Sequence, residues 1–209
     1  MNLTERDLDL LETLTLRVPM LTVPQTGEVW WPKTCHQRAA RHRLALLARS
    51  GWIERHIINA HPPLATLHPL FSWMPGEQDP DGEHIAYESR TRWSQPTRPT
   101  EVYVASPRTA CVLGSTARGL PPLEHRDHDL RLAAVYVHYR KSHPRLASSW
   151  ISQHALPKAG YRLKDPDALL RHANGRVLRV IQAAGRWNAA QVASFHEYCI
   201  QSDLPYELW

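Results

Sequence analysis

The sequence is poor in the features that mark secreted, zinc-binding and membrane proteins. Its three cysteines, at positions 35, 111 and 199, are odd in number and far apart, so they match neither a disulfide framework nor a zinc-binding spacing. No window approaches the roughly 18 uninterrupted apolar residues of a membrane span. The start MNLTERDLDLLE is acidic and amphipathic, unlike a secretion signal. We therefore expect a cytoplasmic protein with no membrane partner.

The patterns of nucleotide-dependent and covalent catalysis are also lacking. The nine glycines are isolated from one another, so there is no glycine-rich loop to hold a phosphate. Ser, Cys and His are present, but no arrangement of them singles out a nucleophile. We expect no cofactor, no metal ion and no catalytic residue.

The sequence does contain an excess of positive charge. Its 25 Lys and Arg outnumber 20 Asp and Glu, which gives a formal net charge of +5, and 13 histidines can add to it. This balance suits a polyanionic partner such as nucleic acid. At 209 residues the chain is long enough for two small domains, each with its own core.

The segment from 34 to 58 predicts a helix that leads into a strand. Thr34 offers an N-cap hydroxyl and Gly51 a left-handed C-terminal cap, which predicts a helix from about Cys35 to Arg49. Helical periodicity puts three apolar residues on a face that can pack: Ala40, Leu44 and Leu47. It puts the cationic residues on the opposite face: Arg38, Arg41, His42 and Arg49.

This predicted helix holds four Arg and two His but no acidic residue. Arginine on the outer face of a helix is usually solvated surface, yet a solvated face normally mixes both signs and gains i,i+4 pairs. The absence of acids therefore favours contact with DNA over a plain solvated face.

Two further helices are predicted before this one. Thr4 and Asp7 form a capping-box pattern at the start of the first helix, and Thr22 and Gln25 start a second that runs to about Trp30. Three helices, the third basic and followed by WIERHII, give the order of a winged helix-turn-helix.

The segments LTERDLDLLETL, VPMLTV and RAARHRLALLARSGWIERH resemble the start of replication-relaxation proteins of plasmids and integrative elements. The resemblance extends over the first 60 residues and less closely over the last 85. It implies a winged helix followed by a domain related to the restriction-endonuclease fold. It also implies a role in transcriptional control, or in replication and mobilisation of a genetic element.

Residues 61–120 are rich in proline and turn residues and predict an extended wing and linker, with short strands at Ile85–Trp93 and at EVYVASP. Residues 121–209 predict a small α/β domain. Its expected elements are a helix from His128 to Lys141, an irregular stretch over 150–161, a hairpin of 168–173 and 176–184, a helix capped by Asn188, and a strand over 205–209. The predicted fold class is α+β, with a winged helix-turn-helix over residues 1–60 and a degenerate restriction-endonuclease-like domain over residues 121–209.

A nuclease of that fold carries an acid on one strand and an acid-x-Lys pair on the next, where the carboxylates hold Mg²⁺. Here Asp167 precedes the hairpin, and the matching stretch of its second strand is VIQAAG. Gln182 then stands at the position of the second acid and Ala184 at that of the lysine. Because a neutral amide is a poor ligand for Mg²⁺, we interpret the domain as a nuclease-like scaffold without nuclease chemistry.

The cluster HRDHD at 125–129 is a second polar constellation. Metal binding is one interpretation. Capping and dipole stabilisation of the following helix is the one we favour, because no third ligand lies at a set spacing.

These observations predict a non-catalytic, sequence-specific protein that binds double-stranded DNA, with a homodimer as the expected assembly. A metal-dependent nuclease and a protein-interaction adaptor built on a winged helix are the alternatives. The residues expected to contact DNA are Lys33, Thr34, Gln37, Arg38, Arg41, His42, Arg49, Arg55 and His56.

Overall fold

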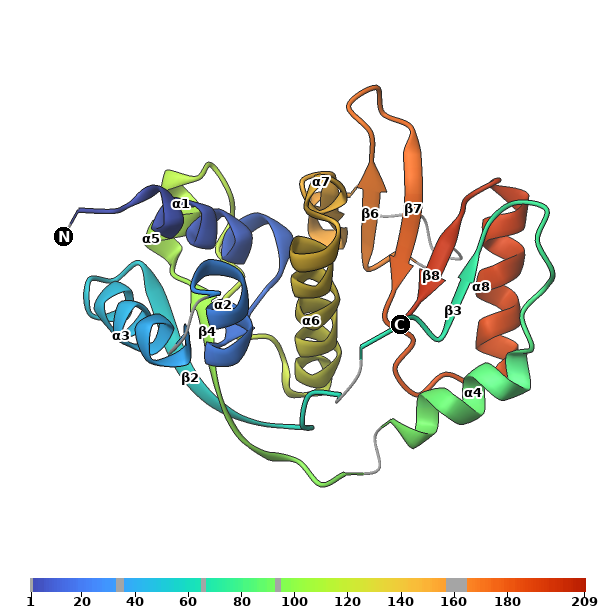
Figure 1. Ribbon diagram of the computed structural model, residues 1–209, viewed down its shortest axis with the longest axis horizontal. Helices are drawn as coiled ribbons and strands as arrows, with labels where there is room; N and C mark the ends of the chain where they lie inside the picture. The colour runs from blue at the N-terminus through green and yellow to red at the C-terminus, as the bar shows by residue number, and fades with distance from the viewer. Residues whose placement is uncertain (1, 33–35, 65–66, 93–94, 157–164) are drawn as a thin grey trace. The chain divides into compact units, whose positions relative to one another are not determined.

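The computed structural model describes residues 2–32, 36–64, 67–92, 95–156 and 165–209. The chain forms two compact units, each of mixed α and β structure (Figure 1). Unit 1 comprises Met1–Pro62 and Thr97–His143, and unit 2 comprises Pro63–Pro96 and Pro144–Trp209. These bounds differ from the predicted division, because residues 97–143 belong with the N-terminal helices.

Unit 1 contains helices and a small sheet. Its elements are α1 (Glu5–Glu12), the π-helix η1 (Thr13–Arg17), β1 (Leu21–Thr22), α2 (Val23–Trp30), α3 (His36–Arg49), β2 (Ile53–Ala60), β4 (Arg98–Ala105), α5 (Pro107–Val112), the 3₁₀-helix η2 (Leu123–His125) and α6 (Arg126–Ser142).

The helix ends of unit 1 follow the predicted capping chemistry. Thr4 and Asp7 form a capping box at α1, and Thr22 and Gln25 form a second one at α2. Gly51, just past α3, has a φ of 73°, which confirms the left-handed cap. The predicted N-cap of α3, Thr34, lies outside the described residues.

The sheet of unit 1 has the order β1-β4-β2, and both pairings are antiparallel. β2 and β4 pair along their whole length, from Ile53 opposite Ala105 to Ala60 opposite Arg98. The chain between them, residues 61–97, includes two elements of unit 2. The strand predicted at EVYVASP is thus the partner of the strand after α3, rather than part of a linker.

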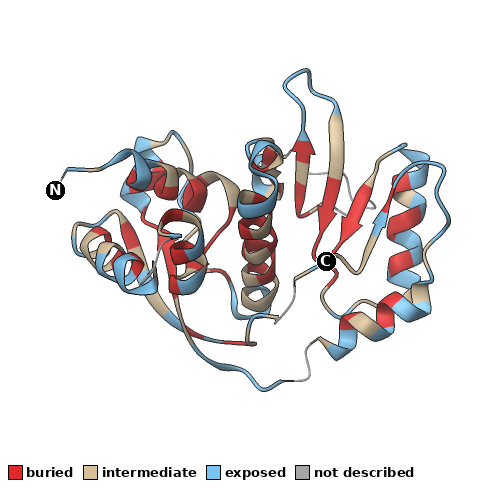
Figure 2. Ribbon diagram, viewed as in Figure 1, coloured by how far each residue is buried: buried red, intermediate tan, exposed pale blue. Residues whose placement is uncertain are grey.

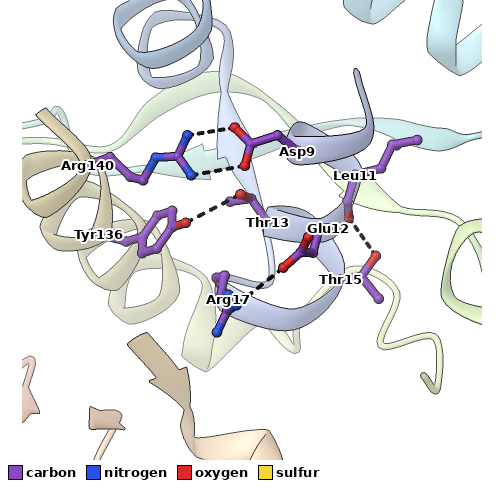
Figure 3. A network of polar contacts seen from close by, with 8 residues as sticks. All are labelled: Asp9, Leu11, Glu12, Thr13, Thr15, Arg17, Tyr136 and Arg140. Atoms are coloured by element: carbon purple, nitrogen blue, oxygen red, sulfur yellow. Dashed lines mark hydrogen bonds and ion pairs between the residues drawn. The ribbon is translucent and has the colours of Figure 1, made fainter. Parts of the chain in front are cut away.

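Helix α6 is fastened to the first two helices by polar contacts (Figure 3). Arg140 donates to both carboxylate oxygens of Asp9, at 3.0 and 2.6 Å, and the hydroxyl groups of Tyr136 and Thr13 lie 3.4 Å apart. Lys141 forms an ion pair with Glu28 at 2.7 Å. The predicted helix at 128–141 is therefore confirmed, but it completes unit 1.

Unit 2 contains a five-stranded sheet of order β3-β8-β7-β6-β5. Its strands are β3 (Phe71–Trp73), β5 (Trp150–Ser152), β6 (Ala168–Arg171), β7 (Val177–Gln182) and β8 (Tyr206–Leu208), and its helices are α4 (Gly82–Thr91), α7 (Pro144–Ala147), η3 (Gln153–Ala155) and α8 (Ala189–Gln201). β7 and β8 are parallel, and the other neighbours are antiparallel. The predicted hairpin and final strand are confirmed, as is the helix capped by Asn188.

Two local predictions in unit 2 are wrong. The segment predicted as a strand at Ile85–Trp93 is instead helix α4, which Asp81 caps and which buries Ile85, Ala86 and Ser89. It packs on α8 so closely that a Cβ on Gly82 would lie 3.3 Å from the Ala189 carbonyl oxygen. The stretch expected to be irregular, 150–161, begins with strand β5.

The core of unit 2 lies between the sheet and one side of α8 (Figure 2). Val192, Phe195 and Cys199 of α8 pack with Tyr206 and Leu208 of β8. Among the described residues, none of the helices has both the length and the apolar character needed to cross a membrane.

Candidate nucleic-acid interface

Helix α3 divides into a buried and an exposed side, as its sequence predicts. Ala40, Leu44 and Leu47 are each 0% exposed. The polar residues expected to face a partner are all exposed: Gln37, Arg38, Arg41, His42 and Arg49 (Figure 2). Arg38, His42 and Arg49 lie within about 40° of one another around the helix axis, and we call these three the cationic stripe.

Arg43, the remaining arginine of α3, points to α1 instead. Its Nε donates to Asp7 Oδ1 at 2.8 Å, its Nη2 donates to the other oxygen, and Asp7 is 1% exposed. Burial raises the pKa of Asp7, but hydrogen bonds from Arg43 and Thr4 outweigh it and lower the pKa overall. α3 has no acidic residue of its own, and Asp7 of α1 neutralises Arg43. It does not neutralise the cationic stripe.

Arg41 lies at the edge of the stripe that is nearer the sheet. Its charge contributes to the lowered pKa of Glu101 on β4, and it partly opposes the rise in the pKa of Tyr103. Among the described residues, Arg38 and His42 form no ion pair. The cationic stripe of α3 therefore faces outward. On one side of it Asp7 pairs with Arg43, and on the other the charge of Arg41 acts on Glu101.

The two predicted wing residues are paired with acids, which differs from the expectation that they lie free along a DNA backbone. Arg55 Nε lies 2.6 Å from Glu101 Oε1, and His56 Nε2 lies 3.4 Å from Glu54 Oε2. Tyr103 also donates to Glu101 Oε1, at 2.8 Å. Burial and the Glu101 charge raise the pKa of Tyr103 to about 12. Sequence inspection missed the Arg55 partner because Glu101 comes from β4, 46 residues away, whereas Glu54 lies only two residues from His56 on β2.

Lys33 and Thr34, the remaining predicted DNA contacts, lie outside the described residues.

The structure adds one cation that the sequence did not suggest. The Cζ atom of Arg108 lies 4.1 Å from the centre of the Trp52 ring, and Nη1 donates to the Ser50 carbonyl oxygen at 3.1 Å. The start of α5 lies beside the end of α3, where Ser106, the N-cap of α5, donates its hydroxyl to Gly51 O at 2.8 Å. Only the pairing of β2 with β4 brings these segments together, so no local pattern reveals the contact.

Asp167 and Gln182, the two positions that the sequence compares with a nuclease site, are in hydrogen-bond contact in unit 2. Asp167 is 4% exposed, and its Oδ2 accepts hydrogen bonds from Gln182 Nε2 and the Ala183 backbone, both at 2.7 Å. Ala184 is fully buried. Among the described residues, the amide oxygen of Gln182 is buried without a hydrogen-bond partner. The described parts of the chain also hold no group of three or more His, Cys, Asp or Glu suited to a metal ion.

The capping interpretation of 125–129 is wrong in its hydrogen bonds. No side chain caps α6. Asp127 instead accepts from the backbone and the ring Nδ1 of His61, both at 2.8 Å, and so fastens the end of β2 to α6. Asp127 and Asp129 still lie in the first turn, where negative charge favours a helix.

Comparison of the chain with family models, with curated proteins and with solved structures found no match.

Proposed function

We propose that unit 1 is a winged helix-turn-helix that binds double-stranded DNA through the exposed side of α3. The observation that carries the proposal is the division of α3, in which Arg38, Arg41 and Arg49 are exposed while Arg43 is neutralised by Asp7. An arginine face that served only solubility would gain from acidic neighbours at i,i+4 spacing, and α3 has none.

The order of elements supports this fold. α2 and α3 form a packed helical pair, and the strands that follow α3 belong to a sheet of order β1-β4-β2. In a winged helix the strands after the recognition helix form a hairpin beside the DNA. Here β2 and β4 take that place, and residues 61–97 replace the short turn between them.

The dimensions of α3 suit a major groove. Its 14 residues make a rod about 21 Å long, which enters a groove about 12 Å wide. The N-terminal residues of a recognition helix reach base edges. Gln37, Arg38, Arg41 and His42 lie in that half of α3, so they are the proposed readers of sequence, and Arg49 lies nearer the DNA backbone.

We further propose that unit 2 is a restriction-endonuclease-like scaffold without nuclease activity. A catalytic carboxylate needs free oxygen lone pairs for Mg²⁺. Asp167 Oδ2 already accepts two hydrogen bonds, and its neighbour Gln182 supplies an amide in place of a second carboxylate. The biological role in this proposal is control of transcription, or replication and mobilisation of a genetic element, carried out by a homodimer in the cytoplasm.

The direct test is the variant R38A/R41A in a duplex-binding assay. Both side chains are exposed, so the unfolding transition should stay at its wild-type position. Binding should weaken by about tenfold or more, because a bidentate arginine contact is worth roughly 1 to 3 kcal/mol. The matched control is R145A/R176A, which removes two exposed arginines from unit 2. Equal binding by wild type and R38A/R41A would contradict the proposed face.

The absence of nuclease activity is tested by incubating supercoiled plasmid with the protein and Mg²⁺ or Mn²⁺. The plasmid should remain intact. Cutting that disappears in D167A would overturn the assignment of unit 2 as a scaffold.

A further inference from the structure

Arg108 is exposed, yet its guanidinium group is held in one place. The ring of Trp52 supports one face of the group at 4.1 Å, and the Ser50 carbonyl oxygen accepts from Nη1. A guanidinium carries five N–H donors in a planar fork, so this arrangement leaves most of them facing outward. An ordered cation of this kind loses less conformational entropy on binding than a free lysine or arginine does.

Arg108 lies beside the C-terminal end of α3, where the cationic stripe ends. The stripe runs from Arg38 through His42 to Arg49, the last residue of the helix. Ser50, the acceptor of the Arg108 hydrogen bond, is the next residue. An exposed cation of α5 therefore lies next to the residue that follows Arg49.

We propose that Arg108, seated on Trp52, binds a phosphodiester of the DNA backbone beside the groove that α3 enters. This inference rests on the proposed function of α3. The N-terminal half of a recognition helix meets base edges, whereas its C-terminal end lies toward the backbone. A cation at that end reaches phosphate oxygens, so its contribution is independent of base sequence.

A purely structural role is the alternative. An arginine at the C-terminal end of a helix also stabilises the last carbonyl groups. Salt dependence separates the two roles, because each phosphate contact adds about 0.9 to the slope of log affinity against log salt concentration. A structural role changes the unfolding midpoint and leaves that slope unaltered.

The experiment measures affinity for one duplex at several salt concentrations, with wild type, R108Q, R108K and the control R176Q. R108Q should lower the slope by about 0.9, so that its loss of affinity is about threefold greater at 50 mM than at 200 mM salt. The same loss should appear with duplexes of unrelated sequence. R108K keeps the charge and should keep the wild-type slope.

Two results would overturn the inference: a wild-type slope in R108Q, with or without a lower unfolding midpoint, or an equal change of slope in R176Q. If R38A/R41A abolishes binding while R108Q keeps the wild-type slope, the proposed function stands and the role of Arg108 does not. If neither variant affects binding, the proposed function itself fails.

Discussion

The two units place their charged groups in opposite ways. In unit 1, two arginines that face α1 have carboxylate partners, Arg43 with Asp7 and Arg140 with Asp9, while the stripe on α3 faces outward. In unit 2, the two carboxylates in the sheet region, Asp167 and Glu207, are buried and held by donors of the same unit. Unit 1 thus exposes a row of cations on one helix, whereas unit 2 buries two paired carboxylates. This difference is why we assign binding to unit 1 and a supporting role to unit 2.

The largest expected change in stability comes from breaking the ion pair between Arg43 and Asp7. D7A leaves Arg43 beside the core without its partner and removes the capping box of α1. The free energy of unfolding should fall by about 3 kcal/mol, as measured by urea denaturation. E5Q, which changes an exposed acid in the same turn, should shift it by about 0.5 kcal/mol or less. If D7A is as stable as E5Q, the pairing of Arg43 with Asp7 does not stabilise unit 1, and Arg43 does not differ from the exposed arginines in the way proposed.

A second carboxylate placed beside Asp167 tests whether this part of unit 2 is a closed polar contact or an empty metal site. In Q182E the new group faces Asp167 at hydrogen-bond distance, so the free energy of unfolding should fall by about 2 kcal/mol at pH 7. The loss should shrink at pH 5, where one of the two carboxyl groups takes up a proton. Q182A, which only removes a donor, should cost about 1 kcal/mol at both pH values. If Q182E is as stable as the wild type at pH 7, residues 167 and 182 are not buried together in the way that we describe.

Acid should destabilise unit 1 through its ion pairs. The pKa values of Asp7 and Asp9 lie below the ordinary 3.8, because hydrogen bonds from Arg43 and Arg140 outweigh the effect of burial, which alone raises them. Lowered pKa values in the folded state mean that this stabilisation is complete above about pH 4 and is lost as the pH falls through the folded-state values. The urea midpoint of D9N should therefore fall less than that of wild type between pH 4 and pH 2. An equal fall in both proteins would show that Asp9 does not carry the effect.

The smallest expected effect concerns the sheet beside α3. E101Q removes the carboxylate that pairs with Arg55 and so adds a free cation next to the proposed DNA face. Affinity for duplex DNA at low salt should rise by about twofold, with a steeper salt dependence. The pair is partly exposed, so stability should change by less than about 1 kcal/mol. Lower affinity in E101Q would mean that Glu101 positions Arg55 for binding.

Local chemistry in the sequence was enough to predict the N-caps of α1, α2 and α8, the glycine that ends α3, the two sides of α3 and the hairpin of unit 2. Thr22 with Gln25, and Gly51, specify helix ends through groups only a few residues apart. The hairpin is similarly local, since Gly175 has a φ of 88° in the turn between β6 and β7. Features of this kind need no knowledge of the rest of the fold.

The remaining features depend on contacts between distant segments. The partners of Arg43 and Arg55 come from α1 and β4, and Arg108 reaches Trp52 only because β4 returns to β2. The strand predicted at Ile85–Trp93 was wrong for a similar reason. In a segment this short, the spacing of apolar residues does not distinguish a strand from a helix that packs on one side. The division into units could not be predicted for the same reason, since the chain leaves unit 1 over residues 63–96 and then returns to it.

The most direct test of the central claim is selection of bound duplexes from a random DNA pool by the full chain, followed by affinity measurements at several salt concentrations. Our account predicts an enriched motif, with log affinity falling linearly as log salt concentration rises, and two-fold symmetry in the motif if the protein binds as a dimer. Recovery of no motif, together with weak binding that disappears near physiological salt, would contradict it and would leave the arginines of α3 as ordinary surface charge.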